Sequence, residues 1–163
     1  MSAQNPQTVA RSRAYRLLAA YLGQDREASD VLGYELGQDR EAWERLTLEL
    51  VAFLWAEVLQ RFGVDLHDRD ADWPVEAVTL LERDLAVEAD EHRKLGLSLT
   101  LASVEAENHP ALEVLLAEVE DYRPVVVALA DLVVAQRTRQ AQAELLGEVL
   151  GGLDVLLDPR VSQ

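Results

Sequence analysis

The chain has 163 residues, no cysteine, and thirty carboxylates against fifteen lysines and arginines, which gives a formal net charge of −15. This charge argues against a cationic nucleic-acid binder and against docking on anionic membranes, and the lack of cysteine excludes disulfides, thiol catalysis and cysteine-ligated zinc. The length fits a single helical domain over 1–163, with flexible tails expected at 1–5 and 159–163. The polar first ten residues lack the apolar core of a signal peptide, and no apolar stretch reaches the roughly 20 residues of a membrane span, so we expect a cytoplasmic protein.

Apolar residues that recur every three or four positions predict helices from the start of the chain. The first is predicted over 6–22, where Tyr15, Leu18 and Leu22 lie on one apolar stripe, and a short second helix is predicted over 26–36. The hexapeptide Gly-Gln-Asp-Arg-Glu-Ala occurs at 23–28 and again at 37–42. In each copy the glycine can end one helix, the aspartate can cap the next, and the glutamate lies in the first turn. We interpret the repeat as a recurrent capping solution, because repeats that stack into a solenoid are about 20–50 residues long.

The helix predicted over 40–62 has the broadest apolar stripe of the chain. A helix that is apolar around most of its circumference is buried by neighbours on several sides, so we expect this helix to be the central element. The stripe consists of Trp43, Leu46, Leu50, Leu54, Val58 and Phe62.

The second half of the chain is predicted to be helical as well. Pro74 is expected to open a helix that continues to about residue 93. Residues 94–107 alternate leucine with other residues, which also permits a strand, but leucine and alanine favour a helix and no pairing strand is evident. Gly96 is expected to mark a break in this region.

Three further apolar patterns complete the chain, at about 110–122, 125–135 and 139–157. The β-branched residues of 125–135 also permit a strand, but no pairing strand is evident. Pro124 is expected either to open a new helix or to kink a continuous one. The last pattern carries Leu146, Leu150, Leu153 and Leu157 at spacings of 4, 3 and 4. Together these elements predict an all-α fold, a compact bundle of six or seven helices around a central long helix at about 40–62.

Two clusters contain residue types that can bind metals. Asp68, Asp70 and Asp72 have the D-x-D-x-D core of a calcium loop, but Trp73 and Thr79 stand where an EF-hand needs glycine and glutamate. We interpret them as a solvated acidic loop, with a looser divalent-cation site as the alternative.

The second cluster contains Glu88 and His92, which are four residues apart. Di-iron bundles use Glu-x-x-His, a spacing of three, and residue 89 is alanine. We therefore expect Glu88/His92, and likewise Glu105/His109, to be exposed pairs on a helix, and we expect no cofactor.

The chain has no nucleophile elbow and no phosphate- or dinucleotide-binding glycine motif, so we lean towards a non-enzymatic function. The surplus of apolar helical surface predicts an interaction protein: an adaptor, a helical chaperone, or an assembly or regulatory subunit. Its grooves would bind another protein or a second copy, with no direct contact with nucleic acid or membrane. The alternatives are an acidic nucleic-acid mimic that occupies a basic protein, and a helical protein that binds a small ligand or a divalent metal.

The candidate partner-binding residues are Arg11, Arg13, Arg16, Trp43 and Trp55. The three arginines lie near the start of a helix, where the macrodipole disfavours cations, and we expect the acidic middle of the chain to compensate them. Asp131 is expected on a narrow polar stripe of an apolar helix, with a buried acid as the alternative. Gly147 and Gly151 form G-x-x-x-G, which we interpret as close internal packing or a fray point near the C-terminus rather than a dimer seam.

Overall fold

Helix α3 (Arg40–Arg61) lies in the middle of the molecule, as its broad apolar stripe predicts. Helices α1, α5 and α7 all pack against it. Eight of its side chains are buried: Trp43, Leu46, Thr47, Leu50, Val51, Leu54, Val58 and Leu59. The prediction of a central helix over about 40–62 is confirmed.

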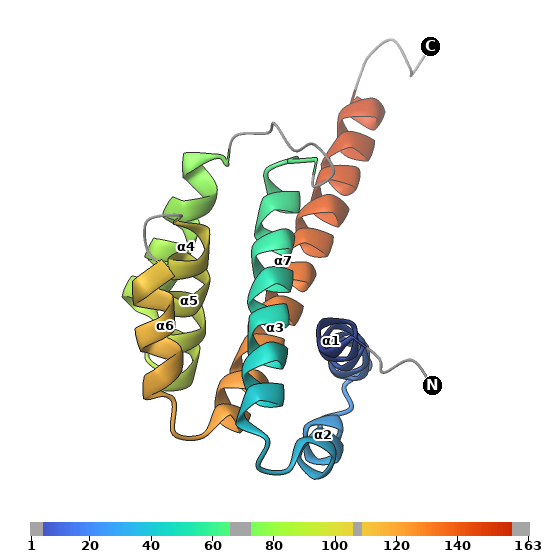
Figure 1. Ribbon diagram of the computed structural model, residues 1–163. Helices are drawn as coiled ribbons and strands as arrows, with labels where there is room; N and C mark the ends of the chain where they lie inside the picture. The colour runs from blue at the N-terminus through green and yellow to red at the C-terminus, as the bar shows by residue number, and fades with distance from the viewer. Residues whose placement is uncertain (1–4, 66–72, 106–108, 158–163) are drawn as a thin grey trace.

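The computed structural model describes residues 5–65, 73–105 and 109–157, except for the side chains of His109 and of residues 142–157. Across these ranges the chain forms seven helices and no strand, which confirms the all-α prediction (Figure 1). The other six are α1 (Pro6–Leu22), α2 (Ala28–Leu36), α4 (Val75–Val87), α5 (Glu91–Val104), α6 (His109–Glu118) and α7 (Tyr122–Leu157).

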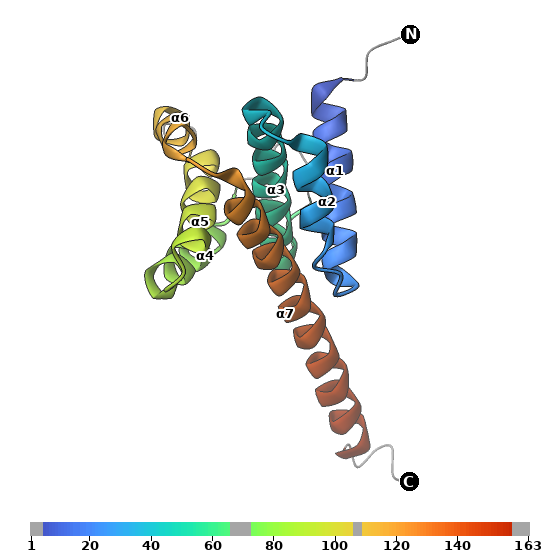
Figure 2. The ribbon, with the colours of Figure 1, turned by 90° about the horizontal axis from the view of Figure 1, so that it is seen from below.

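The helices lie in three groups around one apolar core. Helices α1 and α2 lie on one side of the α3–α7 pair, and α4, α5 and α6 lie on the other (Figures 1 and 2). Every described helix contributes a buried side chain to the same core. Because all the helices share this core, a pair of them on its own would leave its apolar side chains exposed, and we do not expect such a pair to be stable.

The region around residues 88–104 differs from the prediction in two ways. The helix that begins after Pro74 ends at Val87 rather than near residue 93, because the Asp90 carboxylate accepts hydrogen bonds from the backbone N–H groups of His92 and Arg93 and so caps a new helix. Gly96 is not a break: it lies inside α5, buried against α7. The helical interpretation of residues 94–107 is confirmed as far as Val104.

The last two predicted elements, at 125–135 and 139–157, belong to one continuous helix. Helix α7 runs without interruption for 36 residues, and Pro124 lies in its first turn, where no intrahelical N–H donor is needed. The sequence predicts separate elements at 125–135 and 139–157, on either side of Gln136. Gln136 is buried there, and its side-chain amide accepts from Arg61 and donates to Asp84, so a polar residue continues the buried face.

The two hexapeptides behave differently. In the second copy Gly37, at φ +53°, ends α2, and the Asp39 carboxylate accepts the N–H of Ala42 at the start of α3, as predicted. In the first copy Gly23 ends α1, but the Asp25 carboxylate accepts the N–H of Glu27, one residue before α2 begins, and α2 has no side-chain cap. The prediction that Asp25 caps the next helix is therefore wrong.

The tail residues 1–4 and 158–163 and the acidic residues Asp68, Asp70 and Asp72 lie outside the described residues. Residue 5 is within them: Asn5 caps α1 through a hydrogen bond from the N–H of Gln7 to its side chain.

Candidate protein-docking groove

An apolar hollow of about 140 Å³ lies where α1, α3 and α7 meet. We call it the α1–α3–α7 groove. Only two of its lining residues carry a charge, Glu57 and Arg137. The complete lining is Tyr15, Leu18, Ala19, Leu22, Phe53, Glu57, Val133, Val134 and Arg137.

Helical spacing explains how these residues reach one place. On each helix the lining positions are separated by one, three or four residues, which puts them on a single face. Leu18 and Val133 are buried and form the floor. Tyr15 and Leu22 form the rim, with 57% and 44% of their surface exposed.

Tyr15 is held in place although it is exposed. Its ring packs edge-on against Phe53 of α3, with the ring centroids 4.8 Å apart and the planes at 77°. Aromatic pairs in this geometry are attractive beyond the area they bury. The rim of the groove is therefore ordered before any partner arrives.

Glu57 is the one acid of the groove. Burial raises the pKa of its carboxyl above the ordinary value, and the positive charge of Arg137 only partly opposes that effect. A further cation next to Glu57 would favour the ionised form. The groove thus offers apolar contacts together with one incompletely compensated acid.

Two larger hollows flank the turn between α6 and α7 and share Asp121 and Arg123. Their volumes are about 400 and 550 Å³, but Arg123 of this turn and Arg40 of α3, which line them, already have partners within the fold. The Arg123 guanidinium donates to the Asp30 carboxylate. Arg40 donates to the carbonyls of residues 116, 117 and 119, which end α6.

The three predicted arginines of α1 do not line the groove. Each of them pairs with an acidic side chain of α2 or α3. Arg11 lies 3.4 Å from Glu49, and Arg13 and Arg16 lie 3.5 and 2.8 Å from Glu35. The hydrogen bond from Arg16 is the main reason why the pKa of Glu35 falls below its ordinary value. The expectation that the chain's own acidic middle compensates these cations is confirmed.

The two predicted tryptophans do not line the groove either. Trp43 is buried in the core, and its indole N–H donates to the Gly37 carbonyl at 3.0 Å. Trp55 is half-buried and packs edge-on against Trp73, with the ring centroids 5.9 Å apart. The groove residues Tyr15 and Leu22 belong to a predicted apolar stripe. The sequence alone does not show which residues of that stripe are buried and which are exposed.

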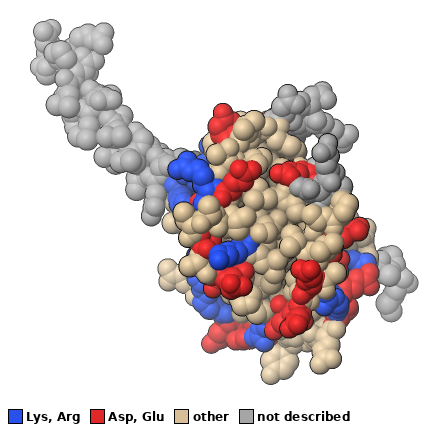
Figure 3. Space-filling view, turned by 90° about the vertical axis from the view of Figure 1, so that its left-hand side faces the viewer, with Lys and Arg blue, Asp and Glu red and all other residues tan. Residues whose placement is uncertain are grey.

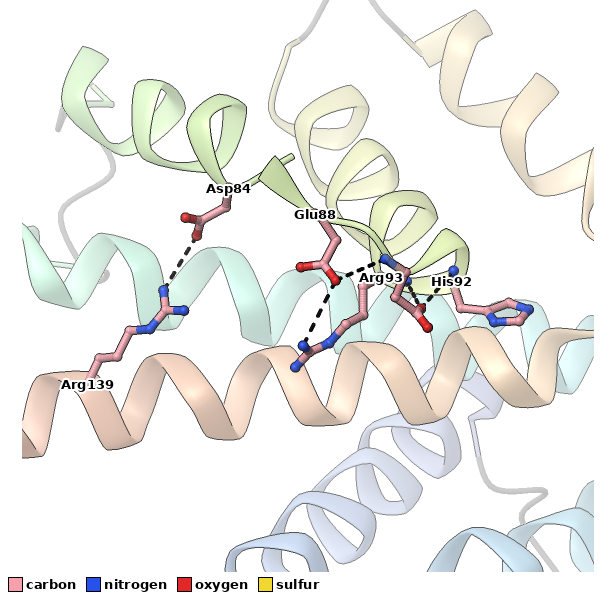
Figure 4. A network of polar contacts seen from close by, with 6 residues as sticks. Asp84, Glu88, His92, Arg93 and Arg139 are labelled. Carbon is pink, nitrogen blue, oxygen red and sulfur yellow. Dashed lines mark hydrogen bonds and ion pairs between the residues drawn. The ribbon is translucent and has the colours of Figure 1, made fainter. Parts of the chain in front are cut away.

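Glu88 and His92 do not form the predicted pair within one helix. Glu88 follows the end of α4, and His92 lies in α5 (Figure 4). The Glu88 carboxylate accepts the backbone N–H of Asp90 and lies 4.0 Å from the Arg93 guanidinium. The prediction was wrong because the Asp90 cap separates the two residues.

Glu105 and His109 are also divided between helices, because α5 ends at Val104 and α6 begins at His109. In the described ranges, no group of three or more His, Asp and Glu side chains is arranged to hold a metal ion.

Asp131 is half-buried on α7 and is bonded to Arg26 of the first hexapeptide. The Arg26 guanidinium also lies 4.6 Å from the centroid of the Tyr21 ring. Asp131 is therefore neither a buried acid nor a freely solvated one: it holds the α1–α2 connection against α7. The surroundings of Gly147 and Gly151 lie outside the described side chains.

The chain matches no known protein family, no curated protein and no solved structure. None of the described helices has both the length and the apolar character that a bilayer span requires.

Proposed function

We propose that the protein is a non-enzymatic interaction protein, an adaptor, chaperone or regulatory subunit, and that the α1–α3–α7 groove binds an amphipathic helix of a partner protein. The observation that carries this proposal is the rim of the groove, where Tyr15 and Leu22 stay exposed above a buried apolar floor. Ordered aromatic and aliphatic side chains around a concave apolar floor are typical of binding hot spots.

The shape and chemistry of the groove favour a helix as the occupant. An amphipathic helix presents apolar side chains at i, i+3 or i+4 and i+7, and such side chains fill a hollow between packed helices. A lysine or arginine beside that apolar face would reach Glu57, whose burial makes an added cation favourable. The partner segment is thus expected to combine a leucine-rich face with a flanking basic residue.

The arrangement of surface charge gives less support to the acidic nucleic-acid mimic. On the face formed by α4, α5 and α6, acidic and basic side chains are intermingled with uncharged ones (Figure 3). Several carboxylates are paired with arginines of the same chain, among them Glu35, Glu49 and Asp131. A phosphate-like array would need carboxylates that gather on one face, without arginines among them, and that are free to pair with a basic partner.

The test uses two tyrosines that differ in position but not in chemistry. Tyr15 lines the groove, whereas Tyr34 on α2 is 93% exposed and lies outside it. Proteins captured by the full chain from the native lysate would be identified, and the affinity of the captured partner would then be measured by calorimetry. Tyr15→Ser should weaken this affinity at least about tenfold, which corresponds to about 1.4 kcal/mol, and Tyr34→Ser should leave it unchanged.

Leu22→Asp adds a charge to the same rim and should weaken the complex further. Equal losses for Tyr15→Ser and Tyr34→Ser, or a partner that binds Leu22→Asp as tightly as the original chain, would contradict the proposal.

A further inference from the structure

Helix α2 is weakly specified by its own sequence. It has nine residues, and isolated helices of fewer than about 12–15 residues are marginal in water. Gly33 lies in its interior, where glycine favours a helix less than any residue except proline. No side chain caps the first turn. The helix therefore depends on its contacts with the rest of the molecule.

The apolar contacts of α2 form one narrow ridge. Its buried side chains are Leu32 and Leu36, one turn apart, and Ala28 packs against the core one turn before them. A hollow of about 230 Å³ lies on the α1 side of this ridge, beside Leu17. A second hollow, of about 400 Å³, lies on the other side, beside Trp43. Because hollows flank the ridge on both sides, α2 buries little apolar surface outside it.

An ion pair holds each edge of α2. On the α1 side, the Glu35 carboxylate accepts a hydrogen bond from Arg16 at 2.8 Å. On the α7 side, the Asp30 carboxylate accepts one from Arg123. The Arg123 guanidinium lies so close to Gly33 that a β-carbon there would be 3.2 Å from its Nη1. The two pairs act as clamps on opposite edges of one short helix.

Both clamps are exposed to solvent. The side chains of Glu35 and Asp30 are 36% and 63% exposed. Exposed ion pairs contribute little to stability, and dissolved salt screens them. The attachment of α2 therefore consists of a short apolar ridge and two pairs that weaken as the salt concentration rises. Segments with so few buried contacts can open while the rest of a protein stays folded.

We infer that α2 is a strap that opens from α1 and α7 while the other helices stay folded. The pair between Arg26 and Asp131 anchors the connection that precedes the strap. Opening uncovers Leu17 of α1, which is fully buried and lines the hollow beside α2. Leu17 lies on the opposite side of α1 from Tyr15 and Leu22, because successive helical residues are about 100° apart. The open form thus has an apolar surface separate from the α1–α3–α7 groove, and the inference does not depend on what the groove binds.

Hydrogen exchange of the full chain tests the strap. The backbone amides of residues 32–36, which are bonded within α2, should exchange at least about 100-fold faster than those of residues 50–58 in the buried middle of α3, after correction for intrinsic rates. Equal protection of the two segments would overturn the inference. This comparison uses the original chain and needs no variant.

Leu81→Ala separates local opening from unfolding of the whole protein. Leu81 is fully buried in α4, on the other side of the α3–α7 pair from α2 (Figure 1). The cavity destabilises the whole fold and should speed the exchange of residues 50–58 at least about 30-fold. Residues 32–36 should keep their rate, because their opening does not involve α4. An equal rise in both segments would mean that α2 opens only when the whole protein unfolds, which would overturn the inference.

The dependence on salt tests the clamps. Raising the NaCl concentration from about 50 mM to about 0.5 M should speed the exchange of residues 32–36 about threefold. The double variant Glu35→Gln/Asp30→Asn should lose this response, because it has no clamp to screen. Glu41→Gln, the matched control, removes an exposed pair with Arg45 within α3 and should keep the response. Equal rates in both salts for the original chain, or a double variant that responds like it, would show that ion pairs do not hold the strap closed and would overturn the inference.

Discussion

Gly96 of α5 and Leu129 of α7 are so close that a β-carbon at position 96 would lie 3.0 Å from Leu129 Cδ2. Both residues are buried in the core, where neighbouring side chains are already close-packed. Glycine therefore costs helix propensity here and permits the approach of two helices. The sequence pattern, in which glycine weakens a helix, had favoured a break at this residue.

Replacing Gly96 with alanine should lower the free energy of unfolding. Overpacking a core costs about 1–3 kcal/mol, which exceeds the gain of at most about 1 kcal/mol in helix propensity. Gly33→Ala in α2 is the matched control, because its new β-carbon meets the flexible end of Arg123 at 3.2 Å. Urea denaturation should show a loss for Gly96→Ala and no loss for Gly33→Ala, which keeps the gain in helix propensity; equal changes would mean that Leu129 can move aside.

Arg40 is expected to stabilise the end of α6. Its guanidinium donates to three carbonyls there, at 2.9–3.2 Å, and lies 5.1 Å from the centroid of the Tyr122 ring. Arg40→Met keeps the apolar stem but leaves these carbonyls without the charged donor, which should cost about 1.5–3 kcal/mol. Arg45→Met, which removes only an exposed pair with Glu41, should cost at most about 0.5 kcal/mol in the same denaturation experiment. Similar costs for the two variants would mean that Arg40 adds no more than a surface ion pair.

The two hexapeptides predict different effects for chemically identical changes. Asp39→Ala removes the side-chain cap of α3 and should cost about 1 kcal/mol. Asp25→Ala removes a bond within a turn before α2 and should cost clearly less. Thermal unfolding followed by circular dichroism measures both. A larger loss for Asp25→Ala would show that the turn, and not the helix start, depends on this motif.

Glu57 and Glu35 should respond to pH in opposite directions. The pKa of Glu57 is raised in the folded protein, so its ionisation opposes folding as pH rises, and Glu57→Gln should increase the free energy of unfolding at pH 7. The pKa of Glu35 is lowered by Arg16, so Glu35→Gln should decrease the free energy of unfolding at pH 7. Both differences should disappear in acid: that of Glu57→Gln below about pH 4, where a free glutamate is protonated, and that of Glu35→Gln only below the lowered pKa of Glu35 in the folded protein.

Urea titrations at pH 7 and at low pH, with the same buffer ions, measure these differences. Effects of the same sign at pH 7, or differences that persist in acid, would contradict the assigned environments of the two carboxyls.

The predictions from sequence were accurate where local chemistry decides the structure. Glycine and proline at the ends of apolar stripes gave the bounds of the first and third helices to within one residue. They were wrong where a polar residue is buried or an internal cap divides a stripe. Gln136 lies between two predicted elements and continues one helix, whereas Asp90 lies within a predicted helix and starts a new one.

The candidate site was less predictable than the fold, since the exposure of a side chain depends on which helix covers it. Trp43 and Tyr15 both belong to apolar stripes, yet Trp43 is covered by neighbouring helices and Tyr15 remains on a rim. The spacing of apolar residues every three or four positions, a local property of the α-helix, determined by itself that this chain is helical and which face of each helix is apolar. Only the tertiary structure decided which parts of those faces are covered, because burial depends on contacts between segments far apart in the chain, such as α1 with α3 and Gly96 with Leu129.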